Sequence, residues 1–198
     1  MPHPLTLHAS VGIPILIVGL TSLGCGTASD GGRVEPVYDA ESGRLQLLKY
    51  DANGDGTIDT WSYMDGARVV RIELDTDRNN VIDRWEYYGP DRTIEKVGTS
   101  RAGDDTPDSW AFFDGTGAIT KLELSTHRNG TVDRVEYYEG GGRVRAEEDT
   151  NADGRIDKWE SYEGSRLASV ALDTGQRGTP DRRVIYAQDG TVRVEDIR

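Results

Sequence analysis

The stretch DANGDGTIDTW (51–61) indicates how the chain should fold, because versions of it return at a nearly fixed interval. The six copies read DANGDGTIDTW from 51, DTDRNNVIDRW from 75, SRAGDDTPDSW from 100, STHRNGTVDRV from 125, DTNADGRIDKW from 149 and DTGQRGTPDRR from 173. They start 24, 25, 25, 24 and 24 residues apart, a period typical of repeat architectures. We call the first nine residues of the copies loops 1 to 6 and number the positions in each loop from 1 to 9.

Two alternating stretches separate one loop from the next, and both have the period of a β-strand. The first carries aromatic side chains two residues apart, as in DRWEY (83–87), and a glycine-containing turn follows it. The second, such as VRIEL (70–74), leads to the next loop, and its charges at every second place argue against a helix. The sequence therefore predicts an all-β fold: an elongated antiparallel β-meander, a single-layer hairpin array of six 24–25-residue repeats. We expect more than ten strands and almost no helix after residue 40.

The alternation also predicts two different faces for this sheet. One face should carry the aromatic and aliphatic side chains, including Trp61, Trp85, Trp110, Trp159, Leu48, Ile72, Val97, Leu122, Ala146 and Val170. The opposite face should carry cross-strand charge pairs, such as Arg84 and Arg134 with Glu86 and Glu136.

The N-terminal segment has the pattern of an export signal. Residues 1–24 hold no Lys, Arg, Asp or Glu, and their apolar stretch VGIPILIVGL (11–20) is too short to span a membrane. The following TSLGC (21–25) resembles a bacterial lipobox, in which Cys25, the only cysteine, would be lipidated. Ser22 before Leu23 and the absence of Lys or Arg near the N-terminus depart from the usual pattern. The alternative is a plain secretory signal followed by a free or buried thiol.

This interpretation divides the chain into three parts. Residues 1–24 would be a lipoprotein signal peptide, 25–43 the lipidated Cys25 and a flexible tether, and 44–198 the repeat domain with its acidic loops. We expect an exported outer-membrane lipoprotein, held to the membrane by its lipid anchor and facing the periplasm or the cell surface.

The charge of the chain limits its partners. The formal net charge is −12, all of it after residue 24. Nucleic acid is not expected as a partner, because phosphate contacts require clustered Lys and Arg. Divalent cations or basic partners are compatible with this charge.

Two hairpin sequences resemble a known class of repeat. WEYYGPDRTIEKV (85–97) and VEYYEGGGRVRAE (135–147) are similar to the hairpin repeats of MORN-type and YwqK-like bacterial proteins. The resemblance covers most of residues 44–198 and implies an elongated single-layer sheet with a scaffolding or binding role. A protein or a cell-surface polysaccharide would be the partner. The Asp-rich loops depart from the Gly-rich links of those families, so their own partners do not carry over.

The loops resemble the calcium loops of EF-hand and dockerin proteins. That pattern places side-chain oxygens at positions 1, 3, 5 and 9, a backbone carbonyl at 7 and Gly at 6. Calcium prefers such oxygen ligands, so the resemblance implies calcium as the cofactor. The expected side-chain ligands are Asp51, Asn53, Asp55 and Asp59 in loop 1, Asp75, Asp77, Asn79 and Asp83 in loop 2, and Asp149, Asn151, Asp153 and Asp157 in loop 5. The expected carbonyl ligands are those of Thr57, Val81 and Arg155. In loop 2, Asn80 replaces Gly, which is tolerable because Asn accepts a positive φ.

The other three loops have lost part of the pattern. Loop 3 has Ala102 at position 3, loop 4 has His127 there, and loop 6 has Arg177 at position 5. We expect these three loops to be turns only. The alternative for all six is that their Asp and Asn side chains merely bond their own backbone.

The residue at position 12, counted from the first residue of a loop and so three residues beyond its end, distinguishes a strand from an EF-hand helix. Glu86, Glu136 and Glu160 occupy the place of the bidentate EF-hand glutamate. In a strand, three residues beyond position 9 carry the chain roughly 10 Å away. Because we predict strands, we expect these glutamates to pair with cations and not to bind metal.

Enzymatic chemistry has little support in the sequence. His127 is the only histidine after residue 24, and no Ser/His/Asp set, phosphate-binding glycine loop or thiol–His pair is present. We expect no enzyme, but a calcium-binding, calcium-stabilised envelope scaffold or adhesion module. The alternatives are a MORN-like interaction protein without metal and, less favoured, an envelope hydrolase.

Overall fold

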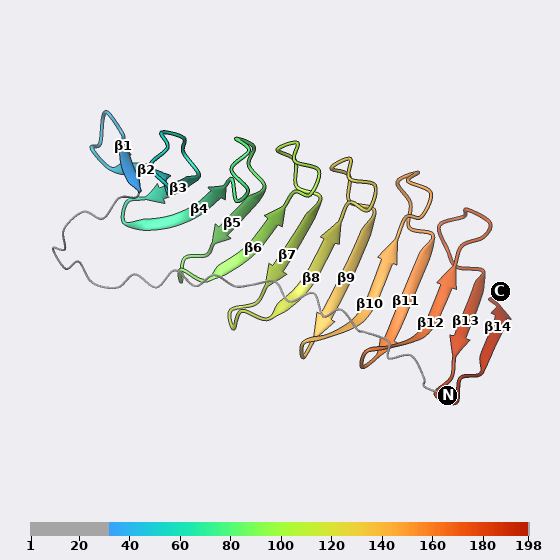
Figure 1. The fold of residues 1–198 in the computed structure, drawn as a ribbon. Helices are drawn as coiled ribbons and strands as arrows, with labels where there is room; N and C mark the ends of the chain where they lie inside the picture. The colour runs from blue at the N-terminus through green and yellow to red at the C-terminus, as the bar shows by residue number, and fades with distance from the viewer. Residues whose placement is uncertain (1–31, 198) are drawn as a thin grey trace, which may run out of the picture.

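A computed structural model describes residues 32–197 as one open antiparallel sheet of fourteen strands (Figure 1). The strands are β1 (Arg33–Tyr38), β2 (Leu45–Asp51), β3 (Thr60–Asp65), β4 (Arg68–Leu74), β5 (Arg84–Tyr88), β6 (Ile94–Thr99), β7 (Ser109–Phe113), β8 (Ile119–Leu124), β9 (Arg134–Glu139), β10 (Gly142–Glu148), β11 (Lys158–Glu163), β12 (Arg166–Leu172), β13 (Arg182–Tyr186) and β14 (Val192–Asp196). The described residues contain no helix, and hence none long and apolar enough to cross a membrane. The predicted all-β fold is confirmed.

The strands lie side by side in the order of the sequence, from β1 to β14. Tight turns join the strands at one end, and loops 1 to 6 join them at the other end (Figure 1). Six of the tight-turn hairpins have a register shift near the turn, as at Tyr63/Met64 and Tyr87/Tyr88. Such bulges increase the local twist of a sheet. The predicted elongated meander, with turns and acidic loops at opposite ends of the strands, is therefore the observed architecture.

The sheet begins earlier than the sequence indicated. Strand β1 (Arg33–Tyr38) lies inside the range 25–43 that was predicted to be a flexible tether, and it pairs with β2. The tether prediction is therefore wrong for these residues, because backbone pairing with β2 orders them although they follow no acidic loop. Cys25 and the predicted signal peptide lie outside the described residues.

The four tryptophans line one face, as predicted. Cross-strand pairing runs from Trp61 through Glu73, Trp85 and Gly98 to Trp110, and residues directly opposite in a sheet share a face. The same row continues to Trp159. We call this side of the sheet the aromatic face.

The predicted aliphatic positions lie on the opposite side, which corrects the expected division of faces. Ile72 lies directly across from Glu86, and Ala146 lies between Glu136 and Glu160. We call this side the aliphatic face. The prediction failed because a register change of one residue exchanges the two faces of a strand, and the register is set by the loops. Charged residues consequently lie on both faces.

On the aromatic face, cations lie over aromatic rings in four successive hairpins. Arg71 lies 3.9 Å from the ring centre of Tyr63, Lys121 lies 4.0 Å from that of Phe112, and Arg145 lies 3.7 Å from that of Tyr137. Each of these cations also pairs with the glutamate two residues later, namely Glu73, Glu123 and Glu147. We call this row the cation–aromatic ladder. It covers the rings of a sheet against which no second layer packs in the described part of the chain.

The ladder differs in the second repeat, at Gly98. This glycine takes the place of the paired glutamate, and the indole of Trp110 lies over it, so that a Cβ at Gly98 would be only 2.7 Å from the ring. Lys96 contacts two rings, with its ammonium 4.4 Å from the centre of Tyr87 and 4.6 Å from that of Trp110. The glycine is therefore required here by close packing of an aromatic side chain.

Candidate metal sites in the acidic loops

All six loops share one backbone shape. Positions 4 and 6 have a positive φ in every loop, including the non-glycine residues Arg78, Arg128, Ala152 and Gln176 at position 4. Asn80 at position 6 of loop 2 has φ 67°, as its replacement of Gly predicted. The sequence did not reveal the positive φ at position 4, because only two of the loops have Gly there.

Two side chains hold this shape in place. The position 9 carboxylate accepts a hydrogen bond from the backbone N–H of position 2 in all six loops, at 2.7–3.1 Å. Where position 1 is Asp, its carboxylate accepts a hydrogen bond from the N–H of position 6, as Asp75 does from Asn80 at 2.8 Å. These bonds are the Asx-type turns of the alternative interpretation. They form in loop 6 as well as in loop 2, so the backbone shape does not require the complete ligand pattern.

Backbone hydrogen bonds join the loops in series. The N–H at position 1 of each following loop donates to the carbonyl at position 9 of the loop before it, at 2.7–2.9 Å. Asp75, for example, donates to the carbonyl of Asp59. A change that orders one loop therefore acts directly on the backbone of its neighbour.

Loop 2 brings its carboxylates together. Asp75, Asp77 and Asp83 each offer an oxygen, and these three oxygens lie within 4.8 Å of one another. In residues 32–197, no other group of three or more His, Cys, Asp and Glu side chains converges in this way. Asn79, the fourth predicted side-chain ligand, contacts the same group, because its backbone N–H donates to both Asp75 and Asp77.

Loop 1 has a different distinguishing feature. Asp51 accepts backbone hydrogen bonds from Gly54 and Gly56 through its two oxygens, and Asp55 bonds Asn53 and the N–H of Thr57. Asp59 is only 5% exposed; one of its oxygens accepts from Ala52, and the other is buried without a hydrogen-bond partner among residues 32–197. A buried carboxylate oxygen without a partner is costly and is satisfied when a cation binds it.

Loop 5 matches the sequence pattern but is less converged. Asp149 caps Gly154, Asp153 accepts from the N–H of Arg155 at 2.9 Å, and Asp157 accepts from Thr150. Its three carboxylates are not gathered as those of loop 2 are. The backbone N–H of Arg155 thus bonds a carboxylate, whereas the equivalent N–H in loop 2, that of Val81, donates to the amide oxygen of Asn79 at 2.8 Å.

In loops 4 and 6, a cationic or ionisable side chain from the loop itself bonds the position 9 carboxylate. Nδ1 of His127 lies 2.7 Å from Asp133, and the guanidinium of Arg177 lies 3.2 Å from Asp181. In loop 6, one oxygen of the position 1 carboxylate, Asp173, is buried and has no hydrogen-bond partner within the described part of the chain. Arg177 therefore occupies the part of loop 6 in which a metal ion would need an oxygen ligand.

The position 12 glutamates lie away from the loops. Glu86 stands in β5, where Arg84 binds one of its oxygens at 2.7 Å and the hydroxyl of Tyr88 donates to the other. The charge pair of Arg84 and Glu86 is within one strand, not across strands as predicted. Residues 32–197 contain no helix that could bring these glutamates back toward positions 1 to 9, so their assignment as charge-pair partners agrees with the structure.

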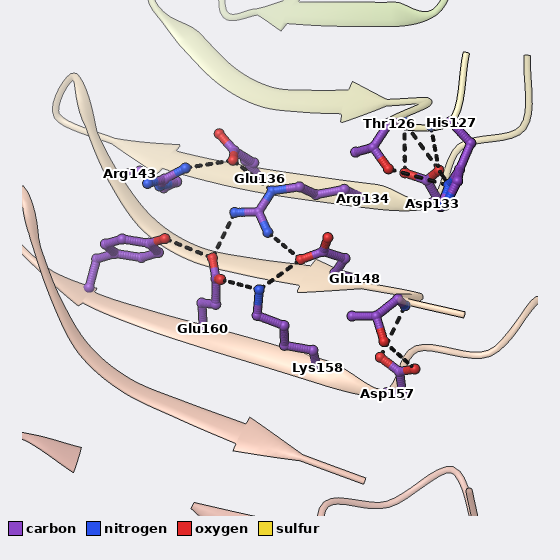
Figure 2. Close-up of polar contacts among 12 residues, drawn as sticks. Thr126, His127, Asp133, Arg134, Glu136, Arg143, Glu148, Asp157, Lys158 and Glu160 are labelled. Carbon is purple, nitrogen blue, oxygen red and sulfur yellow. Dashed lines mark hydrogen bonds and ion pairs between the residues drawn. The ribbon is translucent and has the colours of Figure 1, made fainter. Parts of the chain in front are cut away.

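A cluster of linked ion pairs lies on the aliphatic face between β9 and β11 (Figure 2). Arg134 binds Glu136 at 2.9 Å, Glu148 at 2.7 Å and Glu160 at 2.6 Å, and Lys158 binds the last two of these glutamates. Burial alone would raise the pKa of Glu160, but hydrogen bonds from Arg134, Lys158 and Tyr162 lower it to about 2. We call this group the Arg134 cluster.

Only one pair of this cluster, Arg134 with Glu136, was predicted from the sequence. A signal for the rest is present in the three segments RWEYY (84–88), RVEYY (134–138) and KWESY (158–162). Each places a cation, a glutamate and a tyrosine on one side of a strand, and the tyrosine hydroxyl donates to the glutamate. Which glutamates converge on one arginine depends on strand pairing, which no single segment contains.

Comparison with known proteins gives one local similarity. A family model described as EF hand matches residues 46–60, which include loop 1. The match begins in β2 and ends at the start of β3, so it lies in a strand–loop–strand segment and not in a helix–loop–helix. No curated protein matches the chain.

Two solved structures show a remote likeness. Accessory secretory protein 1, 2 and 3 of Streptococcus pneumoniae is 13% identical, with a TM-score of 0.26, and the match covers 75% of this chain and 20% of that one. The TcdB2–TccC3 structure is 12% identical, with a TM-score of 0.21, and the match covers 81% of this chain and 13% of that one. This chain thus spans a fifth or less of either protein, and neither likeness carries a functional argument.

Proposed function

We propose that this chain is a calcium-binding, calcium-stabilised repeat scaffold. The observation that carries the proposal is the convergence of Asp75, Asp77 and Asp83 within 4.8 Å. Three carboxylates so close repel one another unless a cation neutralises them. The EF-hand match at 46–60 and the unpartnered oxygen of Asp59 support loop 1 as the neighbouring site.

The donor set of loops 1 and 2 fits calcium. Calcium is a hard cation that takes carboxylate, amide and carbonyl oxygens, and both loops offer three Asp and one Asn at positions 1, 3, 5 and 9. An ionised carboxylate has about four acceptor sites, so the observed N–H bonds leave capacity for a metal. Asp75, Asp77, Asn79 and Asp83 would hold the ion in loop 2. Loop 5 has the same residue types and would be a weaker site.

Calcium would act on stability. A ligand that binds the folded state alone stabilises it in proportion to the logarithm of its concentration over Kd. Without a glutamate at position 12, we expect a Kd of about 10⁻⁴ to 10⁻³ M, as in weak extracellular calcium modules. Calcium at about ten millimolar should then raise Tm by about 3–8 °C.

The test compares loop 2 with loop 6. For each variant, Tm is measured in 10 mM calcium and in chelator, so that any loss of turn stability cancels in the difference. Asp75→Ala combined with Asp77→Ala should reduce the calcium-dependent difference, while Asp173→Ala should leave it unchanged. If calcium does not raise the Tm of the unaltered chain, the loops are turns, and a MORN-like interaction module without metal is the better interpretation.

We further propose that this scaffold is a lipoprotein of the outer membrane that binds a protein or polysaccharide partner and catalyses no reaction. Cys25 directly after a short apolar segment, with Gly26 next to it, supports the anchor. Mass spectrometry of the mature N-terminus should find an acylated Cys25. An unmodified Cys25 or a retained Met1 would reject the anchor and leave the calcium proposal intact.

A further inference from the structure

A hollow on the aromatic face lies near the C-terminal end of the array. It has a volume of about 550 Å³ and is lined by Trp159, Ser161, Ser169, Ala171, Pro180 and Arg183. Ligand pockets in proteins have volumes of roughly 300–1,000 Å³. The hollow spans β11, β12 and β13, where Trp159 lies across from Ala171 and Ala171 across from Arg183.

The hollow exists because the cation–aromatic ladder is interrupted there. Ser161 stands where the preceding repeats have Tyr63, Tyr87, Phe112 and Tyr137. Ser169 stands where they have Arg71, Lys96, Lys121 and Arg145, and Ala171 where they have Glu73, Gly98, Glu123 and Glu147. Three small side chains thus replace an aromatic ring, a cation and, in most repeats, a carboxylate. The space that the ladder fills elsewhere is left open between Trp159 and Arg183.

The chemistry of the lining is amphipathic. Trp159 and Ser169 are half-buried, Ser161 is exposed, and all three line the hollow beside buried Ala171. Arg183 is exposed on the other side. Glu195 lies directly across from Arg183 in β14, but its carboxylate pairs with Arg193 at 2.9 Å. Arg183 itself forms no ion pair with the residues that the structure describes.

The charge of this region permits an anionic ligand. Residues 158–198 contain seven Lys and Arg and seven Asp and Glu, so the net charge of −12 belongs entirely to the residues before them. An anion near Arg183 therefore avoids the repulsion that it would meet beside loops 1 and 2. The unpaired guanidinium provides a charge-assisted, bidentate contact for a carboxylate.

We infer that this hollow binds one acidic sugar unit, a uronate, of a polysaccharide. The apolar face of the sugar ring would stack on the indole of Trp159, its hydroxyls would bond Ser161 and Ser169, and its carboxylate would pair with Arg183. A hydrophobic peptide anchor would instead require an enclosed apolar pocket, and this hollow is open and lined in part by two serines and an arginine. The inference rests on the partner-binding role proposed above but does not depend on calcium.

The experiment uses the full chain and an oligogalacturonate as the probe, with binding measured by calorimetry in chelator. The control probe is the methyl ester of the same oligosaccharide, which keeps the sugar rings and removes the charge. The acidic probe should bind, and the ester should bind about tenfold more weakly. Arg183→Ala and Trp159→Ala should each weaken binding of the acidic probe by about tenfold or more. Equal binding of acid and ester would overturn the role of Arg183.

A filling variant keeps the test independent of folding. Ser169→Arg combined with Ala171→Glu introduces the ladder residues of the preceding repeat. There, Arg145 and Glu147 form an ion pair on the same face of the sheet. The variant should keep the Tm of the unaltered chain and lose binding. Retained binding in this variant, or no binding by the unaltered chain, would overturn the inference. Because the assay contains chelator, these results are separate from the calcium-dependent Tm.

Discussion

Loop 2 and the Arg134 cluster each gather three carboxylates, but different groups surround the negative charge in the two places. In the Arg134 cluster, Arg134 lies within 2.9 Å of all three glutamates, and Lys158 supports two of them. In loop 2, Asp75, Asp77 and Asp83 converge with backbone N–H groups, an Asn amide and a Thr hydroxyl as their donors. The first cluster is neutralised by the chain itself. The second retains its negative charge, and this is what makes it a candidate for an external cation.

Loop 6 lies between these two cases. It has the same backbone shape as loop 2, but Arg177 supplies a cation to Asp181 from within the loop. The shape of a loop and its charge are therefore set by different residues. The position 9 carboxylate accompanies the turn in all six loops, and positions 3 and 5 decide whether oxygen or a cation faces its centre.

The largest expected effect comes from removing the internal cation of the Arg134 cluster. Arg134→Ala leaves Glu136, Glu148 and Glu160 without their shared partner, and breaking a buried ion pair in this way costs about 3–5 kcal/mol. We expect a corresponding loss in the free energy of unfolding, measured by urea denaturation. Arg145→Ala is the matched control, because Arg145 pairs with Glu147 on the exposed ladder. A loss no larger than that of the control would show that the cluster is not an energetic centre.

Acid should weaken the same cluster, with Glu160 as the main group. A carboxylate whose pKa is lowered on folding stabilises the protein above its unfolded pKa, and that contribution disappears as the pH falls through the folded pKa. For Glu160, with a folded pKa of about 2 against a usual value of 4.5, the loss should occur between about pH 4.5 and 2 and amount to about 2–3 kcal/mol. Unfolding measured across this range should become less pH-dependent in Glu160→Gln. Glu139→Gln, at an exposed turn, should retain the dependence of the unaltered chain.

Loop 6 should acquire the behaviour of loop 2 when its side chains are changed. Gly175→Asp combined with Arg177→Asp gives Asp at positions 1, 3, 5 and 9 on an unchanged backbone. The double variant should have an additional calcium-dependent rise in Tm of about 3–8 °C, measured against chelator. Arg177→Ala alone is the control and should add less, because it removes the cation without adding oxygen ligands. An unchanged calcium response in the double variant would mean that the loop backbone does not suit the ion.

The smallest expected effect concerns Glu86. Because Arg84 and Tyr88 bind its carboxylate on the aliphatic face, Glu86→Gln should leave the calcium-dependent difference in Tm unchanged. A decrease as large as that caused by changes at Asp75 and Asp77 would identify Glu86 as a ligand. It would also require the start of β5 to rearrange when calcium binds.

The sequence alone determined the repeat, the strand period and the places of all six loops. These features are local: alternation within five residues reports a strand, and Asp, Asn and Gly at fixed offsets report a turn. The four tryptophans on one face follow from the same reasoning, since equivalent positions of a repeat must share a side. The strand assignment of Glu86 and Glu160 followed because a helix was excluded by the charge alternation.

Only the tertiary structure decided which side chains meet. It placed Ile72 opposite Glu86 and so moved the aliphatic positions to the other face, and it gathered glutamates from three strands around Arg134. It also distinguished loop 2, whose carboxylates converge, from loop 5, although the two ligand patterns look equally complete in the sequence. The hollow beside Trp159 is likewise visible only in the structure. Each of these depends on cross-strand register, and a register is a relation between distant segments set by loop geometry and packing. The period of a single strand does not contain it.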